Sequence, residues 1–220
     1  MSIRNVALGA ILALALCVTP ARAGLILNGG FDIPTPGLSP PNYPTSISGA
    51  GVPGPSSAAD WTLYNNFDAT TSTELLPSTD PTGGGSMIHV TSTPTSGSFS
   101  FFNGLQQGFP VQPGGTASVD VDVLSGQVIL ALYPNNGGTL LASTTSTLNG
   151  QWQTLTVTAA AGTNPDLIVL YTDNGTADVV GEFYADGAGV AAVPEPSSLT
   201  LAFGGVGISV LAWRRRRTVA

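Results

Sequence analysis

Short runs of β-branched residues, each ended by glycine, serine, threonine or asparagine, fill the middle of this chain and most constrain its fold. They recur about every 8–14 residues, and no stretch keeps a helical period. In the clearest run, Thr116–Leu124, three valines alternate with Ser118, Asp120 and Asp122, so one face is apolar and the other polar. The pattern predicts an all-β fold.

The β-branched runs predict ten strands in a two-sheet sandwich over residues 24–192. The predicted strands are Gly24–Asn28, Asp60–Tyr64, Ser86–Thr91, Ser98–Gln106, Thr116–Leu124, Gln127–Tyr133, Leu140–Ser143, Trp152–Thr158, Asp166–Thr172 and Gly181–Val190. Seven prolines lie between Pro34 and Pro55. Because proline cannot donate to a strand ladder, residues 34–59 are predicted to be a long surface loop and not a central strand.

Charge is distributed very unevenly along the chain. There is no lysine, and the six arginines are confined to Arg4, Arg22 and Arg214–Arg217, while twelve of the 13 acidic residues lie between Asp32 and Asp186. Nucleic acid is thereby excluded as a partner, because binding to its phosphate backbone requires Lys or Arg. Lysine-dependent P-loop and Schiff-base chemistry are excluded as well. Soluble cations, above all calcium, are the natural partners of these carboxylates.

Both ends of the chain carry apolar segments. Residues 1–23 have a basic start, an apolar run over Val6–Val18 and the cleavage site Ala21-Arg22-Ala23, which predicts a signal peptide; an uncleaved anchor is the alternative. The only cysteine, Cys17, lies inside it, so the mature chain has no disulfide. At the other end, the apolar residues 197–213 precede the arginine stop 214–217, which predicts one transmembrane helix with a cytoplasmic end.

The tail resembles a specific family of sorting signals. It combines Pro194, Glu195 and Pro196, the apolar stretch, and then Arg214, Arg215, Arg216 and Arg217. This order resembles the PEP-CTERM signal, also catalogued as the ice-binding protein C-terminal motif, and covers residues 193–220. The resemblance implies export through the inner membrane of a Gram-negative bacterium, cleavage near the motif by an exosortase, and delivery to the cell surface or exopolysaccharide matrix. The alternative is an ordinary membrane anchor that is never processed. The middle of the chain lacks a regular Thr-x-Thr repeat, so we do not predict an ice-related role.

The middle of the chain resembles the galactose-binding-like jelly rolls found in many carbohydrate-binding modules. The motifs that carry the resemblance are, in order, Leu27–Asp32, Trp61, Leu105–Gln107, Gly150–Leu155 and Phe183–Asp186. In that family a structural calcium often links the first and last strands, which implies one calcium held by Asp32 and Asp186 together with carbonyl oxygens near Asn28–Phe31. Many members carry a second acid where this chain has Gly187. The alternative is that both carboxylates are solvated, with Asp32 capping a turn and Asp186 ending a strand.

Exposed aromatic rings are the usual sugar contacts in such modules. Tyr64, Phe67 and Tyr133 lie close to polar turns and are the candidate ligand-binding residues. The resemblance implies that three other aromatic residues are buried in the sandwich core: Trp61, Trp152 and Phe183.

The sequence offers little for catalysis. His89, the only histidine, lies opposite Ile88 and Val90 in its strand and is predicted to face solvent. Asp120 and Asp122 share one strand face at about 6.6–7 Å, a spacing that could serve a glycosidase acid and base. Carboxylates on a solvent face rarely acquire the raised pKa that a general acid requires.

The sequence therefore predicts a protein that is not an enzyme. We expect an exported surface or matrix protein that acts as a non-catalytic binding module for glycans, including exopolysaccharide, and for calcium. A purely structural matrix or adhesion protein without a saccharide site is the alternative, and a glycosidase is a minor alternative.

Overall fold

The computed structural model describes residues 26–49, 51–65, 69–94, 103–111, 113–134, 138–173 and 180–191. Its strands are β1 (Thr45–Ser48), β2 (Val52–Pro55), β3 (Thr62–Asn65), β4 (Ala69–Pro77), β5 (Ser86–Pro94), β6 (Asn103–Gly108), β7 (Thr116–Ser125), β8 (Gln127–Tyr133), β9 (Ala142–Thr145), β10 (Trp152–Thr158), β11 (Leu167–Asp173) and β12 (Gly181–Ala191). The signal peptide, the tail and Phe67 lie outside the described residues. Among the residues described, no helix has the length and apolar character needed to cross a membrane.

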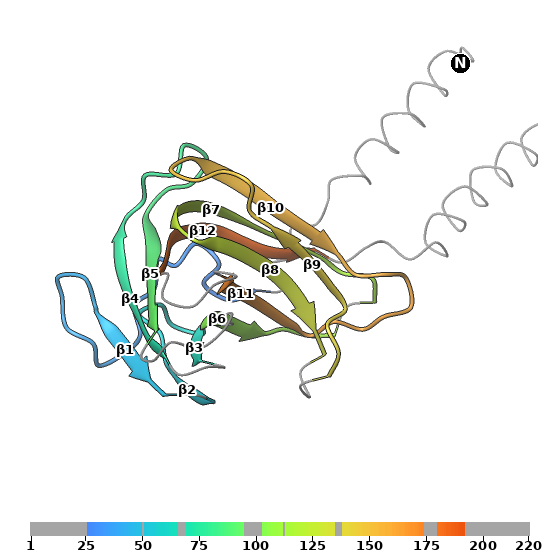
Figure 1. The fold of residues 1–220 in the computed structure, drawn as a ribbon, viewed down its shortest axis with the longest axis horizontal. Coiled ribbons are helices and arrows are strands. Elements are labelled where there is room, and N and C mark those ends of the chain that lie inside the picture. Colours follow the sequence, from blue (N-terminus) through green and yellow to red (C-terminus); the bar gives the residue numbers. More distant parts are fainter. Residues whose placement is uncertain are drawn as a thin grey trace, which may run out of the picture.

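The strands form two stacked antiparallel sheets of six strands each (Figure 1). The first sheet has the order β1-β4-β5-β12-β7-β10, and the second has the order β2-β3-β6-β11-β8-β9. Consecutive strands such as β7 and β8 repeatedly cross from one sheet to the other. The prediction of an all-β, two-sheet jelly-roll sandwich is confirmed.

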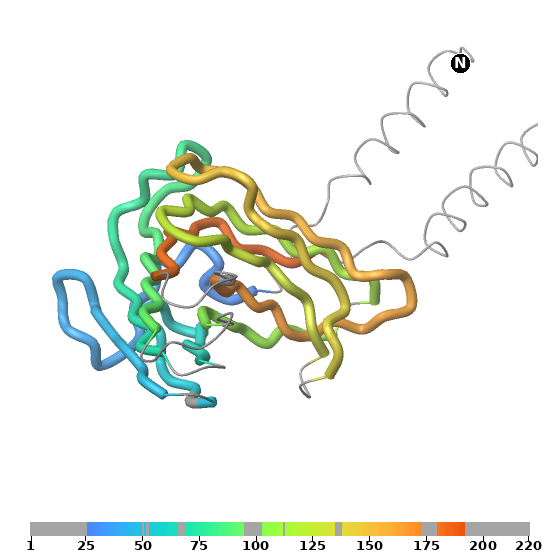
Figure 2. Tube along the Cα trace, in the orientation of Figure 1, coloured from blue at the N-terminus to red at the C-terminus, as the bar shows by residue number. Residues whose placement is uncertain are grey.

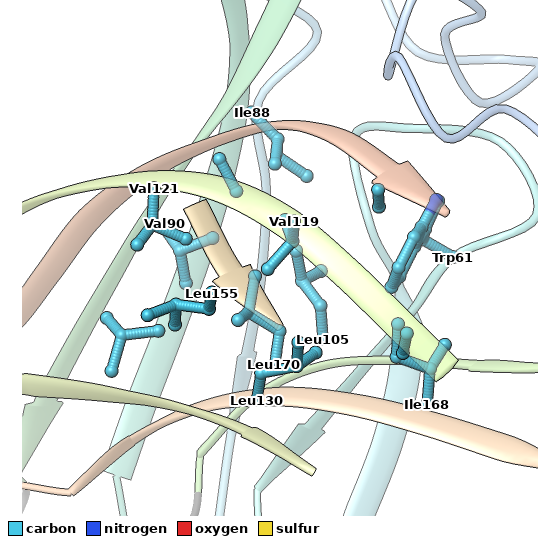
Figure 3. Close-up of a cluster of buried hydrophobic side chains, with 14 of the residues drawn as sticks. Trp61, Ile88, Val90, Leu105, Val119, Val121, Leu130, Leu155, Ile168 and Leu170 are labelled. Atoms are coloured by element: carbon cyan, nitrogen blue, oxygen red, sulfur yellow. The ribbon is translucent and has the colours of Figure 1, made fainter. Parts of the chain in front are cut away.

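The core lies between the inner faces of the two sheets and follows from the alternation seen in the sequence. On β7, Val119, Val121 and Val123 point inward and are at most 1% exposed, while Asp120 and Asp122 point outward. The close-up in Figure 3 shows the inward side chains meeting between the sheets; it labels Trp61, Ile88, Val90, Leu105, Val119, Val121, Leu130, Leu155, Ile168 and Leu170. Burial of this apolar surface is the main force that holds the sandwich together.

The segment predicted as a long loop, residues 34–59, contains two short strands, which corrects that prediction. Both are edge strands: β1 borders the first sheet and β2 the second. Pro53 and Pro55 lie in β2, whose only partner among the described strands is β3. Proline at a sheet edge costs no ladder hydrogen bond on the solvent side, so the sequence excluded a central position but not a strand.

Two other strand predictions are corrected. β4 was missed because its inward positions include Thr71 and Thr73, whose buried hydroxyls hydrogen-bond to Ser92 and Ser57 and hide the apolar alternation. In the predicted strand Gly24–Asn28, the described residues form a turn. That segment is held by Gln107, which accepts from the Leu27 N–H at 2.8 Å and donates to the Leu27 carbonyl at 2.9 Å.

Candidate functional site

Three carboxylates gather where the N-terminal segment, the β4–β5 loop and β12 meet. We call Asp32, Asp80 and Asp186 the acidic cluster. Asp186 lies on β12 and is 1% exposed, and Asp80 lies in the loop and is 7% exposed. The N-terminal segment, blue in Figure 2, reaches β12 because Ala188 donates its N–H to the Gly29 carbonyl at 2.8 Å.

Glycines of the β4–β5 loop create the space in which the acidic cluster lies. A Cβ on Gly83 would lie 2.4 Å from Asp186 Oδ2 and 3.0 Å from Asp80 Oδ2, so these two oxygens approach the same backbone position. A Cβ on Gly85 would lie 2.0 Å from Asp32 Oδ1. Gly85 also has φ +80°, a conformation that side-chain-bearing residues rarely adopt. Larger residues at either position would displace a carboxylate.

Hydrogen bonds fix the orientation of the carboxylates of the acidic cluster. Asp186 Oδ2 accepts from Ser78 Oγ at 2.5 Å, and its Oδ1 accepts from the Gly187 N–H at 2.7 Å. Asp32 Oδ1 accepts from the Ser86 N–H at 2.7 Å. Asp80 Oδ1 accepts from the N–H of the nearby loop residue 82 at 2.9 Å. The cluster is therefore built into the fold and does not consist of freely moving surface side chains.

The negative charge of the acidic cluster is not balanced by any lysine or arginine nearby among the described residues. Burial raises the pKa of Asp186 above its ordinary value of 3.8, and the negative charges of Asp80 and Asp32 raise it further, while the hydrogen bonds from Ser78 and Gly187 act in the opposite direction. No lysine or arginine occurs anywhere between Arg22 and Arg214 to neutralise these groups. A cation from solution would relieve this repulsion.

The two predicted metal residues, Asp32 and Asp186, are thus brought together, and the structure adds Asp80, which sequence reasoning missed. The signal that could have found Asp80 is its place three residues before the run Gly83-Gly84-Gly85, whose lack of side chains lets the carboxylates approach the loop. As they stand, no three His, Cys, Asp or Glu side chains in the described residues form a group able to hold a metal ion. Calcium would therefore need carbonyl or water oxygens and a small movement of the carboxylates.

Asp120, on β7, lies beside the acidic cluster and is linked to it through Thr82, whose hydroxyl also lies 3.0 and 3.1 Å from the two Asp80 carboxylate oxygens. Its Oδ1 accepts from the Thr154 hydroxyl and its Oδ2 from the Thr82 hydroxyl at 3.4 Å. Asp122 points to the same outer face, where its Oδ1 is buried without a hydrogen-bond partner among the described residues. The predicted shared strand face of Asp120 and Asp122 is confirmed.

The second candidate site is the outer face of the second sheet. Tyr64 and Tyr133 both lie on it, because their neighbours Leu63 and Leu132 point into the core. Tyr64 faces Gly104 on β6, which in turn faces Tyr171 on β11. Tyr64 and Tyr133 are half-buried, whereas Tyr171 is 4% exposed.

Uncharged residues, one polar and two apolar, separate the tyrosines on this face. Gln106 faces Val169, and Val169 faces Ala131, in the row between those of Tyr64 and Tyr133. The outer face of the first sheet differs, because it carries several of the acidic residues. We refer to the second sheet's surface of Tyr64, Gln106, Tyr133, Val169 and Tyr171 as the tyrosine face.

His89 is less exposed than the sequence predicted. It does lie on the outer face of the first sheet, but its side chain is only 16% exposed. Its Nδ1 lies 3.0 Å from Glu74 Oε1 and its Nε2 lies 2.9 Å from Glu182 Oε1, and its ring packs on that of Tyr184 with centroids 4.8 Å apart. This histidine joins three strands, β4, β5 and β12.

The three aromatic residues expected in the core divide into two groups. Trp61 and Phe183 are buried, as the resemblance implied, at 3% and 0% exposure. Trp152 is only half-buried and lies opposite Asp122 on the outer face of the first sheet, which corrects that prediction. Its neighbours on β7 are outward-facing residues, so the strand register carries Trp152 outward.

Comparison with known proteins supports the reading of the tail. Residues 192–217 match the PEP-CTERM protein-sorting motif, which confirms the predicted signal and indicates export and sorting to the cell surface. No curated protein matches this chain.

Three solved structures illustrate the similarity of the sandwich. A family 11 carbohydrate-binding module of a cellulosomal cellulase of Clostridium thermocellum is 17% identical, with a TM-score of 0.43, over 68% of this chain and 95% of that one. A family 61 carbohydrate-binding module in complex with β-1,4-galactotriose is 12% identical, with a TM-score of 0.46, over 77% and 99%. The K1 adhesin domain of Lys-gingipain from Porphyromonas gingivalis is 16% identical, with a TM-score of 0.41, over 68% and 98%. These similarities concern the overall sandwich and no particular residue.

Proposed function

We propose that this chain is an exported, non-catalytic glycan-binding module whose saccharide site is the tyrosine face. The observation that carries the proposal is that two half-buried tyrosines, Tyr64 and Tyr133, lie on one sheet surface with Gln106 in the row between them; Tyr171 shares this surface but is only 4% exposed. Tyrosine rings supply flat apolar surface for a pyranose ring and a hydroxyl for hydrogen bonding, and an amide can donate to and accept from sugar hydroxyls.

We propose further that one calcium ion binds at the acidic cluster. Support comes from the burial of Asp186 beside Asp80 and Asp32 in a domain without lysine or arginine. The carboxylates and nearby carbonyl groups are the oxygen ligands that calcium prefers. The ion would tie the N-terminal segment to β12 and the β4–β5 loop, and so act on stability and not directly on the sugar.

The sorting motif places this module in an exported protein, and we propose the steps that follow. Before processing, the tail anchors the chain in the inner membrane of a Gram-negative cell; an exosortase-type enzyme then cleaves near Pro194-Glu195-Pro196. The released domain reaches the cell surface or exopolysaccharide matrix. There the tyrosine face would contact a matrix glycan.

A glycan array probed with the exported protein tests the saccharide site. We expect Tyr64→Ala and Tyr133→Ala each to weaken binding by roughly tenfold, the effect of losing one aromatic contact of about 1.4 kcal/mol. Tyr184→Ala is the matched control, because Tyr184 is also half-buried but lies on the outer face of the other sheet. Absence of any glycan binding would favour the structural alternative. Hydrolysis of chromogenic glycosides that depends on Asp120 or Asp122 would favour the glycosidase.

A further inference from the structure

β10 is the longest edge strand of the sandwich among the described strands. Among the described strands β10 pairs only with β7, and it lies at the margin of the first sheet (Figure 1). It is seven residues long and contains no proline, glycine or charged residue. An edge of this kind exposes unpaired backbone N–H and C=O groups and is a template for another strand.

The three other edge strands among those described are each unfavourable for pairing with another strand. β1 and β9 have only four residues, and β2 carries Pro53 and Pro55. Short strands and prolines are two ways in which natural sheets prevent pairing between molecules. Among the described edge strands, β10 is therefore the one best able to pair with a strand of another molecule.

The charge distribution indicates which partner this edge can receive. Between Asp122 and Asp166 the sequence has no charged residue, and this uncharged stretch supplies β8, β9 and β10. All twelve acids of the segment from Gly24 to Val193 lie outside it, without a lysine or arginine to balance them. The acids nearest to the β10 edge are Asp120 and Asp122, which lie one strand inward on β7, so two copies that meet edge to edge at β10 bring no carboxylate onto the two contacting strands.

We propose that β10 pairs antiparallel with β10 of a second copy of this chain, which would join the two first sheets into one continuous sheet. In a two-fold pair centred on Leu155, Thr154 of each copy faces Thr156 of the other, and threonine pairs across strands are favourable. The exposed side chains of Thr154, Thr156 and Thr158 lie on the outer face, while Leu155 and Val157 stay in the core. Because the other described edges are unfavourable for pairing, the pairing closes at a dimer. This inference does not depend on glycan or calcium binding.

The test compares two substitutions that add the same charge to the same sheet face. Thr156→Glu places a carboxylate on the β10 edge, and Thr93→Glu places one on β5, an inner strand, where Thr93 is also exposed. Sedimentation equilibrium of the full chain in density-matched detergent measures self-association. We expect the wild type and Thr93→Glu to dimerise alike and Thr156→Glu to raise the dissociation constant about tenfold or more.

Hydrogen exchange separates strand pairing from other contacts. As the protein concentration rises, amide exchange should slow in peptides that contain β10 and stay constant in peptides that contain β1 or β2. Thermal unfolding of Thr156→Glu close to that of Thr93→Glu would show that the variant is folded. A wild type that remains monomeric, equal weakening by both substitutions, open-ended assembly, or unchanged exchange in β10 would each overturn the proposal.

Discussion

Ala188 donates its backbone N–H to the carbonyl of Gly29 over 2.8 Å, so that the first described turn lies directly against the last strand. The approach is closer than a side chain would allow, because a Cβ on Gly29 would lie 2.0 Å from the Ala188 oxygen. This contact brings Asp32 to the β12 end of the acidic cluster.

The first prediction is that Gly29→Ala destabilises the domain. The added methyl group meets backbone, which cannot move aside as a flexible side chain can, so we expect a loss of about 1–3 kcal/mol in the free energy of unfolding. Urea denaturation measures it. Gly189→Ala is the matched control, since a Cβ there would meet no atom within 4 Å, and it should leave the midpoint nearly unchanged. Equal losses in both variants would show that the close approach is not the cause.

The second prediction concerns calcium and Asp186. In chelator, Asp186→Asn should melt at a higher temperature than the wild type, because it removes a buried charge beside Asp80 and Asp32 while keeping an acceptor for the Gly187 N–H. Added calcium should raise the melting temperature of the wild type, because the ion binds only the folded state, and leave the variant unchanged. A wild type insensitive to calcium would remove the metal proposal.

The third prediction is the pH dependence of Asp186 in chelator. Its folded pKa is raised above the ordinary value of 3.8, so between those two values the folded state binds more protons than the unfolded state. The contribution of Asp186 to stability is therefore greatest below pH 3.8 and is lost as the pH rises through the folded pKa. We expect denaturation at a series of pH values to show that the free energy of unfolding of Asp186→Asn, relative to that of the wild type, rises across that window. Above the window the difference should stay constant.

The fourth prediction is that His89→Phe destabilises the domain, because Glu74 and Glu182 lose the imidazole that lies between them. Glu74 and Glu182 would lose their shared partner; because both carboxylates are 34% exposed, water can replace part of it, and we expect a loss of about 1 kcal/mol. The same substitution should cost clearly less when Glu74→Gln and Glu182→Gln are already present, because neutral amides no longer need that partner. An equal cost in both backgrounds would attribute the effect to ring packing against Tyr184.

The fifth prediction concerns the tail. If an exosortase-type enzyme processes the chain near Pro194-Glu195-Pro196, mass spectrometry of the surface form should find no peptide from residues 199–220. Replacing Glu195 by Ala tests dependence on the motif and should leave more of the uncleaved form. An intact arginine quartet on the surface protein would contradict processing.

The sequence was most informative where the core consists of apolar side chains. Strands such as β7 alternate so regularly that both their place and their inward face could be predicted. β4 could not be recognised, because Thr71 and Thr73 satisfy their hydroxyls inside the core, which only the folded partners Ser92 and Ser57 make possible. Hydrophobic alternation does not detect a buried hydroxyl pair.

Only two of the three residues of the acidic cluster could be predicted from the sequence, for a related reason. Asp32 and Asp186 came from motif positions, whereas Asp80 lies in a loop whose path depends on how tightly Gly83 packs under the carboxylates. The prediction for Trp152 was wrong because the motif does not determine which face of β10 carries this side chain. That face depends on the register of β10 with β7. Such positions depend on strand pairing between distant segments and not on local pattern.

The length of β12 has a consequence for delivery of the protein. Its pairing with β7 continues to Ala191, and Val190 before it is 4% exposed, so the domain stays folded to that point. Only two residues separate Ala191 from Pro194, a tether of about 10 Å even when fully extended. Any machinery that reads the motif must therefore work almost in contact with the finished domain. If the chain is cleaved near Pro194, the domain would keep only a few residues beyond β12, and the direction in which β12 ends would set the orientation of the domain on the cell surface.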